Sequence, residues 1–214
     1  MNNIILNTQT SYDQVAAEYA EKFKDEMDYK PFDRDCLDRL THEVGSLGPI
    51  CDMGCGPGQI ARYLHRQGVE ALGVDLSPRM IAEAQRLNPA VHFHQGDMLD
   101  LPDADNSWGG IAAFYCNIHI PREQIVEALR EMKRVLKPGG ILLVTFHIGD
   151  EIKHMEEWWE KPVNLDFAFF QPAEVENWLK EAGYELEETL VREPNPEVEV
   201  ATRRAYMFAR KPRV

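Results

Sequence analysis

The sequence predicts an α/β fold: a doubly wound, mostly parallel, seven-stranded sheet with an antiparallel edge strand and helices on both faces. Three observations predict it. Short apolar runs alternate with amphipathic stretches, which is typical of right-handed βαβ units. A glycine-rich turn joins the first apolar run of this series to the helix-like stretch that follows it. A short turn at residues 194–196 joins the last two runs, so one of those two strands must be antiparallel to the other.

The expected elements follow from this alternation. Two helices come first, because residues 11–23 have helical spacing and residues 31–44 begin with proline, which suits a first turn. Further helices are expected at residues 58–68, 77–88, 121–137 and 172–183. Strands are expected at residues 48–54, 69–75, 91–97, 108–116, 139–147, 184–193 and 198–211. The aromatic stretch at residues 148–171 is expected to be irregular.

The composition favours one globular domain and argues against a nucleic-acid partner. The net charge is −13, whereas nucleic-acid binders usually carry a basic surface. No apolar run approaches the roughly 20 residues that span a bilayer. Residues 1–13 lack the basic and apolar regions of a signal peptide. We therefore expect a cytoplasmic protein without membrane contact, and its oligomeric state cannot be read from the sequence.

The cysteines do not predict a metal or redox site. Cys51 and Cys55 are four residues apart, but no second Cys or His pair follows at zinc-finger spacing, and no CxxC motif is present. Cys36 and Cys116 are isolated. We expect reduced, mostly buried thiols and no bound metal.

The glycine-rich turn reads "DMGCGPG" and contains Gly54, Gly56 and Gly58. In a doubly wound sheet this turn lies at the carboxyl ends of the strands, where such sheets bind ligands. Glycines let the backbone turn tightly and let a ligand approach without a Cβ in the way. A plain turn explains one glycine easily and three less well.

Carboxylates follow the next two strands. Asp75 lies 21 residues after Gly54 and is placed to accept hydrogen bonds from both ribose hydroxyls of an adenine nucleoside. The alternative is an N-cap for the following helix, but Ser77 suits that role better. Asp97 and Met98 follow the third strand, where they are placed to meet the adenine amino group and ring; an ordinary turn is the alternative.

Together, "DMGCGPG", "GVDLS", "GDMLDLP" and "LKPGG" resemble, in order and spacing, the class I S-adenosylmethionine-dependent methyltransferases of small-molecule type. The resemblance covers about residues 45–150. It implies a Rossmann-like fold, S-adenosylmethionine as methyl donor, S-adenosylhomocysteine as product, and in-line transfer to a small-molecule acceptor. The residues that it assigns to the cofactor are Asp52, Gly54, Gly56, Asp75, Leu76, Met80, Gly96, Asp97, Met98, Ala113 and Phe114.

The resemblance also implies a plan for the single domain, residues 1–214. Residues 1–30 resemble the family's lid helix, in which Tyr12 and Tyr19 match aromatic positions that cover the cofactor; helix packing is the alternative. Residues 45–147 would form the cofactor-binding core. Residues 148–171 would form an acceptor-pocket insertion, or a small satellite core. Residues 172–214 would add a helix and a β-hairpin.

Catalytic residues are less well defined. The fourth strand begins "WGG", with Gly109 where many relatives carry aspartate, and "NIHIP" keeps only one histidine of a frequent pair. His119 and His147 follow the fourth and fifth strands and are the candidate catalytic residues, with packing or solvation as the alternative. The accepting atom, oxygen, nitrogen, sulfur or carbon, is not specified.

Two other functions remain open. A nucleotide-dependent oxidoreductase would use Asp75 on the ribose of NAD, but its glycine fingerprint is G-x-G-x-x-G and here the third glycine falls one residue early. A non-catalytic S-adenosylmethionine-binding module is the second alternative.

Overall fold

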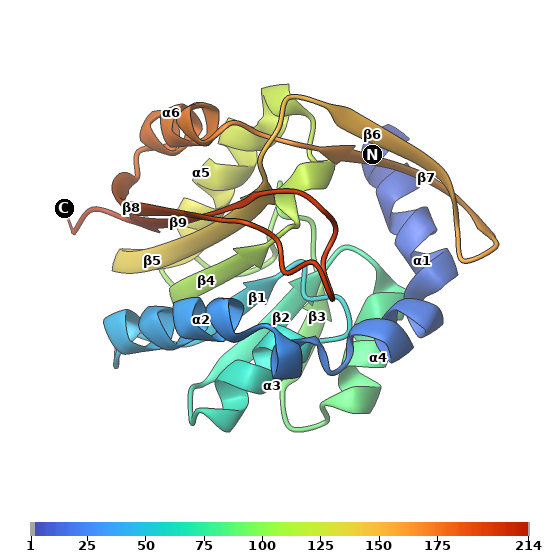
Figure 1. Cartoon of the computed structure of the whole chain (residues 1–214). Helices are drawn as coiled ribbons and strands as arrows, with labels where there is room; N and C mark the ends of the chain where they lie inside the picture. The colour runs from blue at the N-terminus through green and yellow to red at the C-terminus, as the bar shows by residue number, and fades with distance from the viewer. Residues whose placement is uncertain (1–2, 214) are drawn as a thin grey trace.

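A seven-stranded sheet forms the centre of the molecule in the computed structural model, which describes residues 3–213 (Figure 1). Met1 and Asn2 of the expected lid segment, and Val214, lie outside the described residues. The strands are β1 (Ile50–Met53), β2 (Ala71–Asp75), β3 (His92–Gln95), β4 (Trp108–Phe114), β5 (Leu136–His147), β8 (Glu185–Arg192) and β9 (Arg204–Arg210). Their order is β3-β2-β1-β4-β5-β9-β8. The chain order reverses beside β1, which makes its carboxyl end the switch point where ligands bind in such sheets.

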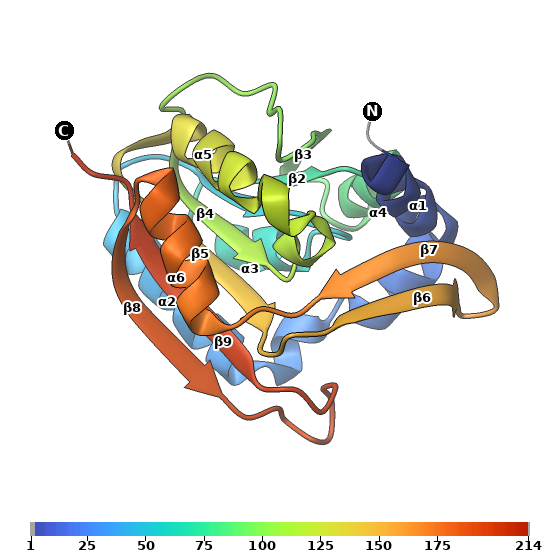
Figure 2. The same ribbon diagram turned by 90° about the horizontal axis from the view of Figure 1, so that it is seen from above.

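Helices cover both faces of this sheet, as predicted (Figures 1 and 2). Helices α2 (Pro31–Val44), α3 (Gln59–Arg66) and α4 (Pro78–Leu87) lie on one face, and α5 (Ile125–Val135) and α6 (Pro172–Ala182) lie on the other. Buried side chains such as Leu37 and Ile60 join α2 and α3 to the sheet, and Met132 and Leu179 do so for α5 and α6. The helices α5 and α6 thus share one core cluster with the sheet, α2 and α3 share another on the opposite face, and α4 packs in a smaller third cluster with Phe93.

The predicted antiparallel strand is present and its position is now defined. β9 is antiparallel to both β5 and β8, so it lies one strand in from the edge, and the edge strand β8 runs parallel to the others. The helix predicted at residues 121–137 is shorter in the structure. A 3₁₀ turn, η3 (Arg122–Gln124), precedes α5, and β5 begins at Leu136, directly after the last residue of α5.

The expectation of an irregular stretch at residues 148–171 is wrong. These residues contain a hairpin of β6 (Ile152–Trp158) and β7 (Lys161–Ala168), paired antiparallel outside the main sheet. Trp159 and Glu160 turn the hairpin with positive φ, the conformation of a tight two-residue loop. The pattern was hidden because neither turn residue is glycine or asparagine, which usually mark such turns.

The N-terminal helix α1 (Asn3–Phe23) begins earlier than predicted and lies across the carboxyl ends of the strands, beside α4 and the hairpin (Figure 1). A 3₁₀ turn, η1 (Glu26–Tyr29), connects it to α2. The α1–hairpin contact is polar as well as apolar: Lys161 Nζ donates to Gln14 O at 2.8 Å, and Asn164 N donates to Ser11 Oγ at 2.8 Å. Together, α1 and the β6–β7 hairpin cover the carboxyl ends of the strands.

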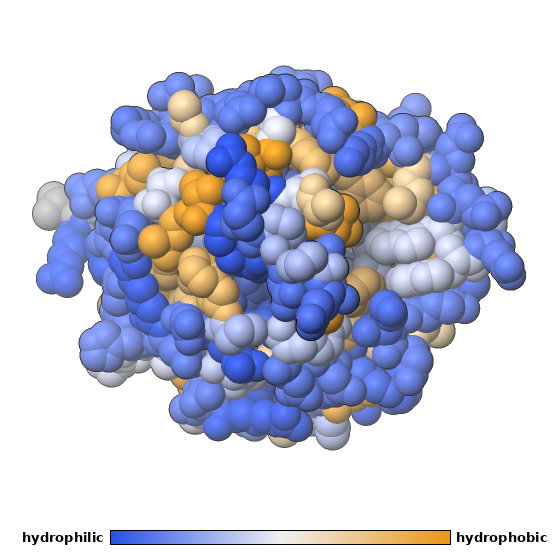
Figure 3. Space-filling model, in the orientation of Figure 1, coloured by the Kyte–Doolittle hydropathy of each residue, from blue (hydrophilic) through white to orange (hydrophobic). Residues whose placement is uncertain are grey.

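Most side chains on the face shown in Figure 3 are hydrophilic, with several separate hydrophobic patches among them. All four cysteines are buried free thiols, which confirms the prediction that they are buried and unpaired. Within residues 3–213, no helix is long and apolar enough to cross a membrane.

Candidate functional site

A cavity lies at the carboxyl ends of β1, β2, β3 and β4, beneath α1. It encloses about 1150 Å³, part of which is open to solvent. The structure brings to it all but two of the residues predicted for the site. Those that line it are Tyr12, Tyr19, Asp52, Gly54, Gly56, Asp75, Leu76, Met80, Gly96, Asp97, Met98, Phe114 and His119. Their roles toward a ligand stay predictions. Ala113 is fully buried within β4 and His147 lies behind the cavity wall, so neither lines it.

The three glycines of the β1–α3 loop serve different purposes. All have positive φ, 67° for Gly54, 49° for Gly56 and 81° for Gly58. A Cβ on Gly54 would lie 2.4 Å from Cys116 Cβ, and one on Gly58 would lie 2.6 Å from a ring carbon of Phe93. A Cβ on Gly56 would meet only Tyr19, at an ordinary 3.6 Å. Only Gly56 therefore leaves room for a ligand, while the other two are required by internal packing.

Asp75 is fixed by the same loop. Its Oδ2 accepts a 2.8 Å hydrogen bond from Gly56 N, and its Oδ1 accepts one of 2.8 Å from Ser77 N. Ser77 is the N-cap of α4, as predicted, since its hydroxyl accepts from Met80 N at 3.0 Å. Burial raises the pKa of Asp75 to about 6, against the lowering effect of the two N–H donors. Each carboxylate oxygen keeps a lone pair for a ligand.

Asp52, at the end of β1, is 1% exposed and accepts a hydrogen bond from Ala61 N at 3.0 Å. Burial raises its pKa to about 8, and the nearby negative charge of Asp75 adds to the rise. At neutral pH this side chain is therefore mostly protonated, so it is a neutral group that can donate as well as accept.

Asp97 and its neighbours form the wall at the end of β3. Asp97 Oδ1 accepts from Leu99 N at 3.0 Å, which orients the turn, and Gly96 N donates to Asp75 O at 3.0 Å. Met98, with Leu76 and the buried Met80, lines the same cavity. An apolar wall with a carboxylate beside it suits a flat heterocycle that carries an amino group.

His119 lines the cavity and contacts the two elements that cover it, the β6–β7 hairpin and α1. Its Nδ1 lies 2.8 Å from Asp166 O on β7, and its Nε2 lies 2.8 Å from the hydroxyl of Tyr12 on α1. A carbonyl oxygen only accepts, so Nδ1 carries the proton and Nε2 accepts from Tyr12. Burial lowers the pKa of His119 to about 4. The imidazole is therefore neutral at pH 7, and it is a weaker base than a free histidine.

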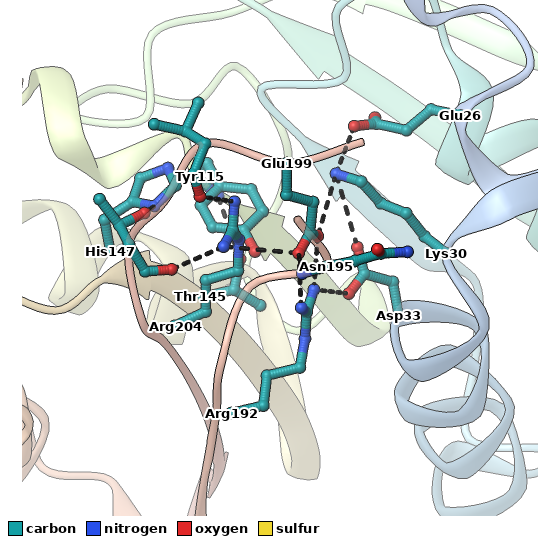
Figure 4. Close-up of polar contacts among 12 residues, drawn as sticks. Glu26, Lys30, Asp33, Tyr115, Thr145, His147, Arg192, Asn195, Glu199 and Arg204 are labelled. Atoms are coloured by element: carbon teal, nitrogen blue, oxygen red, sulfur yellow. Dashed lines mark hydrogen bonds and ion pairs between the residues drawn. The ribbon is translucent and has the colours of Figure 1, made fainter. Parts of the chain in front are cut away.

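Sequence reasoning missed several polar residues of the cavity, among them Glu26, Lys30, Asp33 and Gln59. Among the described residues that line the cavity, Lys30 is the sole lysine or arginine, against five carboxyl groups. Lys30 Nζ lies 2.5 Å from Glu26 Oε1 and 3.9 Å from both Asp33 and Glu199 (Figure 4). No sequence signal marked Glu26, Lys30 or Asp33, because η1 and the start of α2 carry no motif, and Gln59 follows the glycine motif without being part of it.

A buried ion cluster lies behind this end of the cavity (Figure 4). Glu199, whose side chain is 1% exposed, accepts two 2.7 Å hydrogen bonds from Arg192. Burial opposes ionisation of Glu199, but Arg192 and the backbone N–H of Asn195 lower its pKa to about 2. The cluster fixes the loop between β8 and β9 against α2.

His147 belongs to the surroundings of this cluster. Its ring stacks on Tyr115, with centroids 4.8 Å apart, and on Phe169 at 5.4 Å. Its Nδ1 lies 2.8 Å from Thr202 Oγ1, and burial lowers its pKa to about 4. Tyr115 has a positive φ of 52° and stands between His147 and the cavity, which it lines.

Comparison with known proteins agrees with this geometry. Residues 50–140 match the family model described as a methyltransferase domain, Methyltransf_25. The malonyl-[acyl-carrier protein] O-methyltransferase of Enterobacter lignolyticus is 36% identical over 121 residues, which are 53% of this chain and 46% of that protein. A sterol 24-C-methyltransferase of Gibberella zeae is 29% identical over 164 residues, 69% of this chain and 42% of that protein. The chain thus spans about half the length of the curated relatives it matches.

Solved structures extend the likeness to the whole fold. The magnesium protoporphyrin IX methyltransferase of Synechocystis, solved with bound S-adenosylmethionine, superposes with a TM-score of 0.74 over 99% of this chain and 98% of that chain. At 13% identity this shows a shared fold.

The fold is an α/β domain of Rossmann-like type with a cavity at the carboxyl ends of its parallel strands. The match of residues 50–140 to the methyltransferase family confirms the resemblance to the class I, S-adenosylmethionine-dependent methyltransferases that the sequence predicted.

Proposed function

We propose that the protein transfers the methyl group of S-adenosylmethionine to a small-molecule acceptor. The observation that carries the proposal is the position of the Asp75 carboxylate. Hydrogen bonds from Gly56 N and Ser77 N hold it beside the β1–α3 loop, where Gly56 leaves space for a ligand. Such a carboxylate fits two ribose hydroxyls, and the Asp97–Met98 wall fits adenine. When bound, S-adenosylmethionine supplies a methyl group already activated by a positively charged sulfur.

The chain's own residues then have three tasks. Asp75 orients the nucleoside, and the loop at Gly56 provides a surface without side chains. Helix α1, as a lid, and the β6–β7 hairpin exclude water from the reacting atoms, with Tyr12 and Tyr19 in the roof. The acceptor is placed against the ends of β4, where Phe114, Tyr115 and His119 line the cavity.

His119 is proposed to position the Tyr12 hydroxyl in this cavity through its neutral Nε2, and its low pKa makes a role as strong base unfavourable. His119→Ala is compared with His147→Ala, which changes a histidine outside the cavity. We expect a loss of turnover for His119→Ala alone, with S-adenosylhomocysteine affinity retained. If both variants turn over as fast as the wild type, neither histidine has a role in catalysis.

The acceptor class is to be found by screening. The relatives' names refer to a malonyl-[acyl-carrier protein] and to a sterol, so likeness alone does not define it. The protein is incubated with S-adenosylmethionine and with thiol, hydroxyl, amine or carboxylate acceptors in turn. The formation of S-adenosylhomocysteine is then measured for each acceptor.

Calorimetric titration with S-adenosylhomocysteine and with NAD tests the two alternatives. Binding of NAD alone would favour the oxidoreductase. Binding of S-adenosylhomocysteine without methyl transfer to any acceptor would favour the non-catalytic module.

A further inference from the structure

Three consecutive residues attach helix α1 to its surroundings, each through a different element. Ser11 accepts a hydrogen bond from the backbone of β7, and Tyr12 hydrogen-bonds to His119. Asp13 hydrogen-bonds to the N-terminus of α4. Successive side chains of an α-helix point about 100° apart, so these three residues face different sides of α1. The helix is thus attached both on its hairpin side and on its α4 side (Figure 1).

The contact between Asp13 and α4 has two donors. Asp13 Oδ1 accepts from Ser77 Oγ at 2.5 Å and from Arg79 N at 3.1 Å. A carboxylate is favoured there, because unpaired N–H groups give the N-terminus of a helix a partial positive charge. α4 does not depend on Asp13 for its cap, since the hydroxyl of Ser77 itself accepts from Met80 N at 3.0 Å. The contact therefore attaches α1 rather than starting α4.

The other side of α1 is attached to the β6–β7 hairpin by apolar packing. Val15 shares a buried cluster with Val163 and Leu165 of β7. Lys161, at the start of β7, adds a hydrogen bond to the backbone of α1. Parting apolar side chains exposes their surface to water, whereas water replaces most of a hydrogen bond that opens to solvent. α1 and the hairpin therefore form one unit, and a movement of this unit would part it from α4 at Asp13.

The attachment of Asp13 lies directly beside the candidate ligand site. Ser77, which donates through Oγ to Asp13, also donates through its backbone N to Asp75 Oδ1 at 2.8 Å. Thr8 and Tyr12 of α1 line the same cavity as Asp75. A parting of α1 from α4 would therefore open the cavity at the carboxylate that is proposed to hold the ribose.

We propose that α1 and the β6–β7 hairpin form one lid and that Asp13 is the positioning residue that attaches this lid to α4. Release of Asp13 from Ser77 and Arg79 precedes the entry of S-adenosylmethionine and the exit of S-adenosylhomocysteine. The inference rests on the proposed function and adds a residue to it. Asp13 is not among the residues that line the cavity, and it sets the rate at which ligands exchange.

The first experiment needs no ligand and measures hydrogen exchange of the backbone amides of α1 and α4. For Asp13→Ala we expect exchange in α1 to be about 10-fold faster, the effect of losing an acceptor at a helix N-terminus, and exchange in α4 to be unchanged. Asp13→Asn, whose amide oxygen still accepts, should accelerate α1 by about threefold, and it keeps the test usable if Asp13→Ala does not fold. Glu21→Gln, an exposed change on α1, is the matched control and should exchange as the wild type does.

The second experiment measures the association and dissociation rate constants of S-adenosylhomocysteine by surface plasmon resonance. Because the lid opens both before the ligand enters and before it leaves, Asp13→Ala should raise both rate constants about 10-fold and change the dissociation constant by less than about threefold. A residue that supported only the bound ligand would raise the dissociation rate constant alone.

Two kinds of result would overturn the inference and leave the proposed function standing. Exchange that is accelerated equally in α1 and α4, or unchanged in both, would mean that Asp13 does not attach the lid. Faster dissociation without faster association would mean that the lid does not control entry. A wild type that binds no S-adenosylhomocysteine would instead overturn the proposed function and the role in ligand exchange, while the hydrogen-exchange comparison would still decide whether Asp13 attaches α1.

Discussion

Replacing Gly56 with alanine should strongly weaken ligand binding while costing little stability. The new Cβ would meet only Tyr19, at 3.6 Å, so the structural penalty is that of a left-handed backbone, about 1–2 kcal/mol. Gly68→Ala is the matched control, because Gly68 also has positive φ, 81°, and a Cβ there meets nothing within 4 Å. Both variants should lose the same unfolding free energy, and only Gly56→Ala should lose affinity for S-adenosylhomocysteine, by more than about tenfold, because the methyl would project into the cavity.

Gly54→Ala provides the contrast. Its Cβ would lie 2.4 Å from Cys116 Cβ, so an overpacking cost of about 1–3 kcal/mol adds to the same backbone penalty. Urea denaturation measures the stabilities, and calorimetry measures the binding. The reasoning is refuted if Gly56→Ala binds as well as Gly68→Ala. It is also refuted if Gly54→Ala is no less stable than the control.

Three further predictions concern charge. Because the pKa of Asp75 is about 6 and nucleoside hydroxyls need its ionised form, affinity for S-adenosylhomocysteine should fall as pH decreases through about 6, and Asp75→Asn should bind weakly at every pH. The pKa of Asp52 is about 8 in the folded protein against an ordinary 3.8. The unfolding free energy should therefore decrease as pH rises from about 4 to about 8, by on the order of 5 kcal/mol. Urea denaturation of Asp52→Asn, measured across the same pH range, should show a smaller decrease. Glu199→Gln, which removes a buried charge that accepts two hydrogen bonds from Arg192 and leaves Arg192 with Asp33 alone as a charged partner among the described residues, should cost about 3 kcal/mol in urea denaturation, whereas Glu197→Gln, an exposed change, should cost less than about 0.5 kcal/mol.

Each of these has a contradicting outcome. Affinity that stays constant between pH 5 and 8 would remove Asp75 from ligand binding. A stability profile for Asp52→Asn that follows the wild type would mean that this carboxyl group ionises normally. Equal stability of the two glutamate variants would show that the buried ion cluster does not fix the β8–β9 loop.

The sequence alone determined the sheet, its helices and most of the cavity wall, because these depend on local signals. The alternation of apolar runs sets the parallel order, and a Ser-Pro pair at Ser77 starts α4 at the expected residue. Asp75 and Asp97 could be placed together in advance, since parallel strands bring their carboxyl ends to one edge whatever the side chains between them.

Only the tertiary structure decided what those residues face. Gly54 and Gly56 look equivalent in the motif, yet one contacts Cys116 and the other faces the cavity, because their neighbours come from different strands and helices. His119 and His147 both follow strands, but the ring of Tyr115 separates His147 from the cavity. Gln59 could not be identified as a cavity residue in advance, since its amide is held by a contact with Glu26, 33 positions away in the chain. Contacts over such separations leave no periodic trace, and they determine which side chains a ligand can reach.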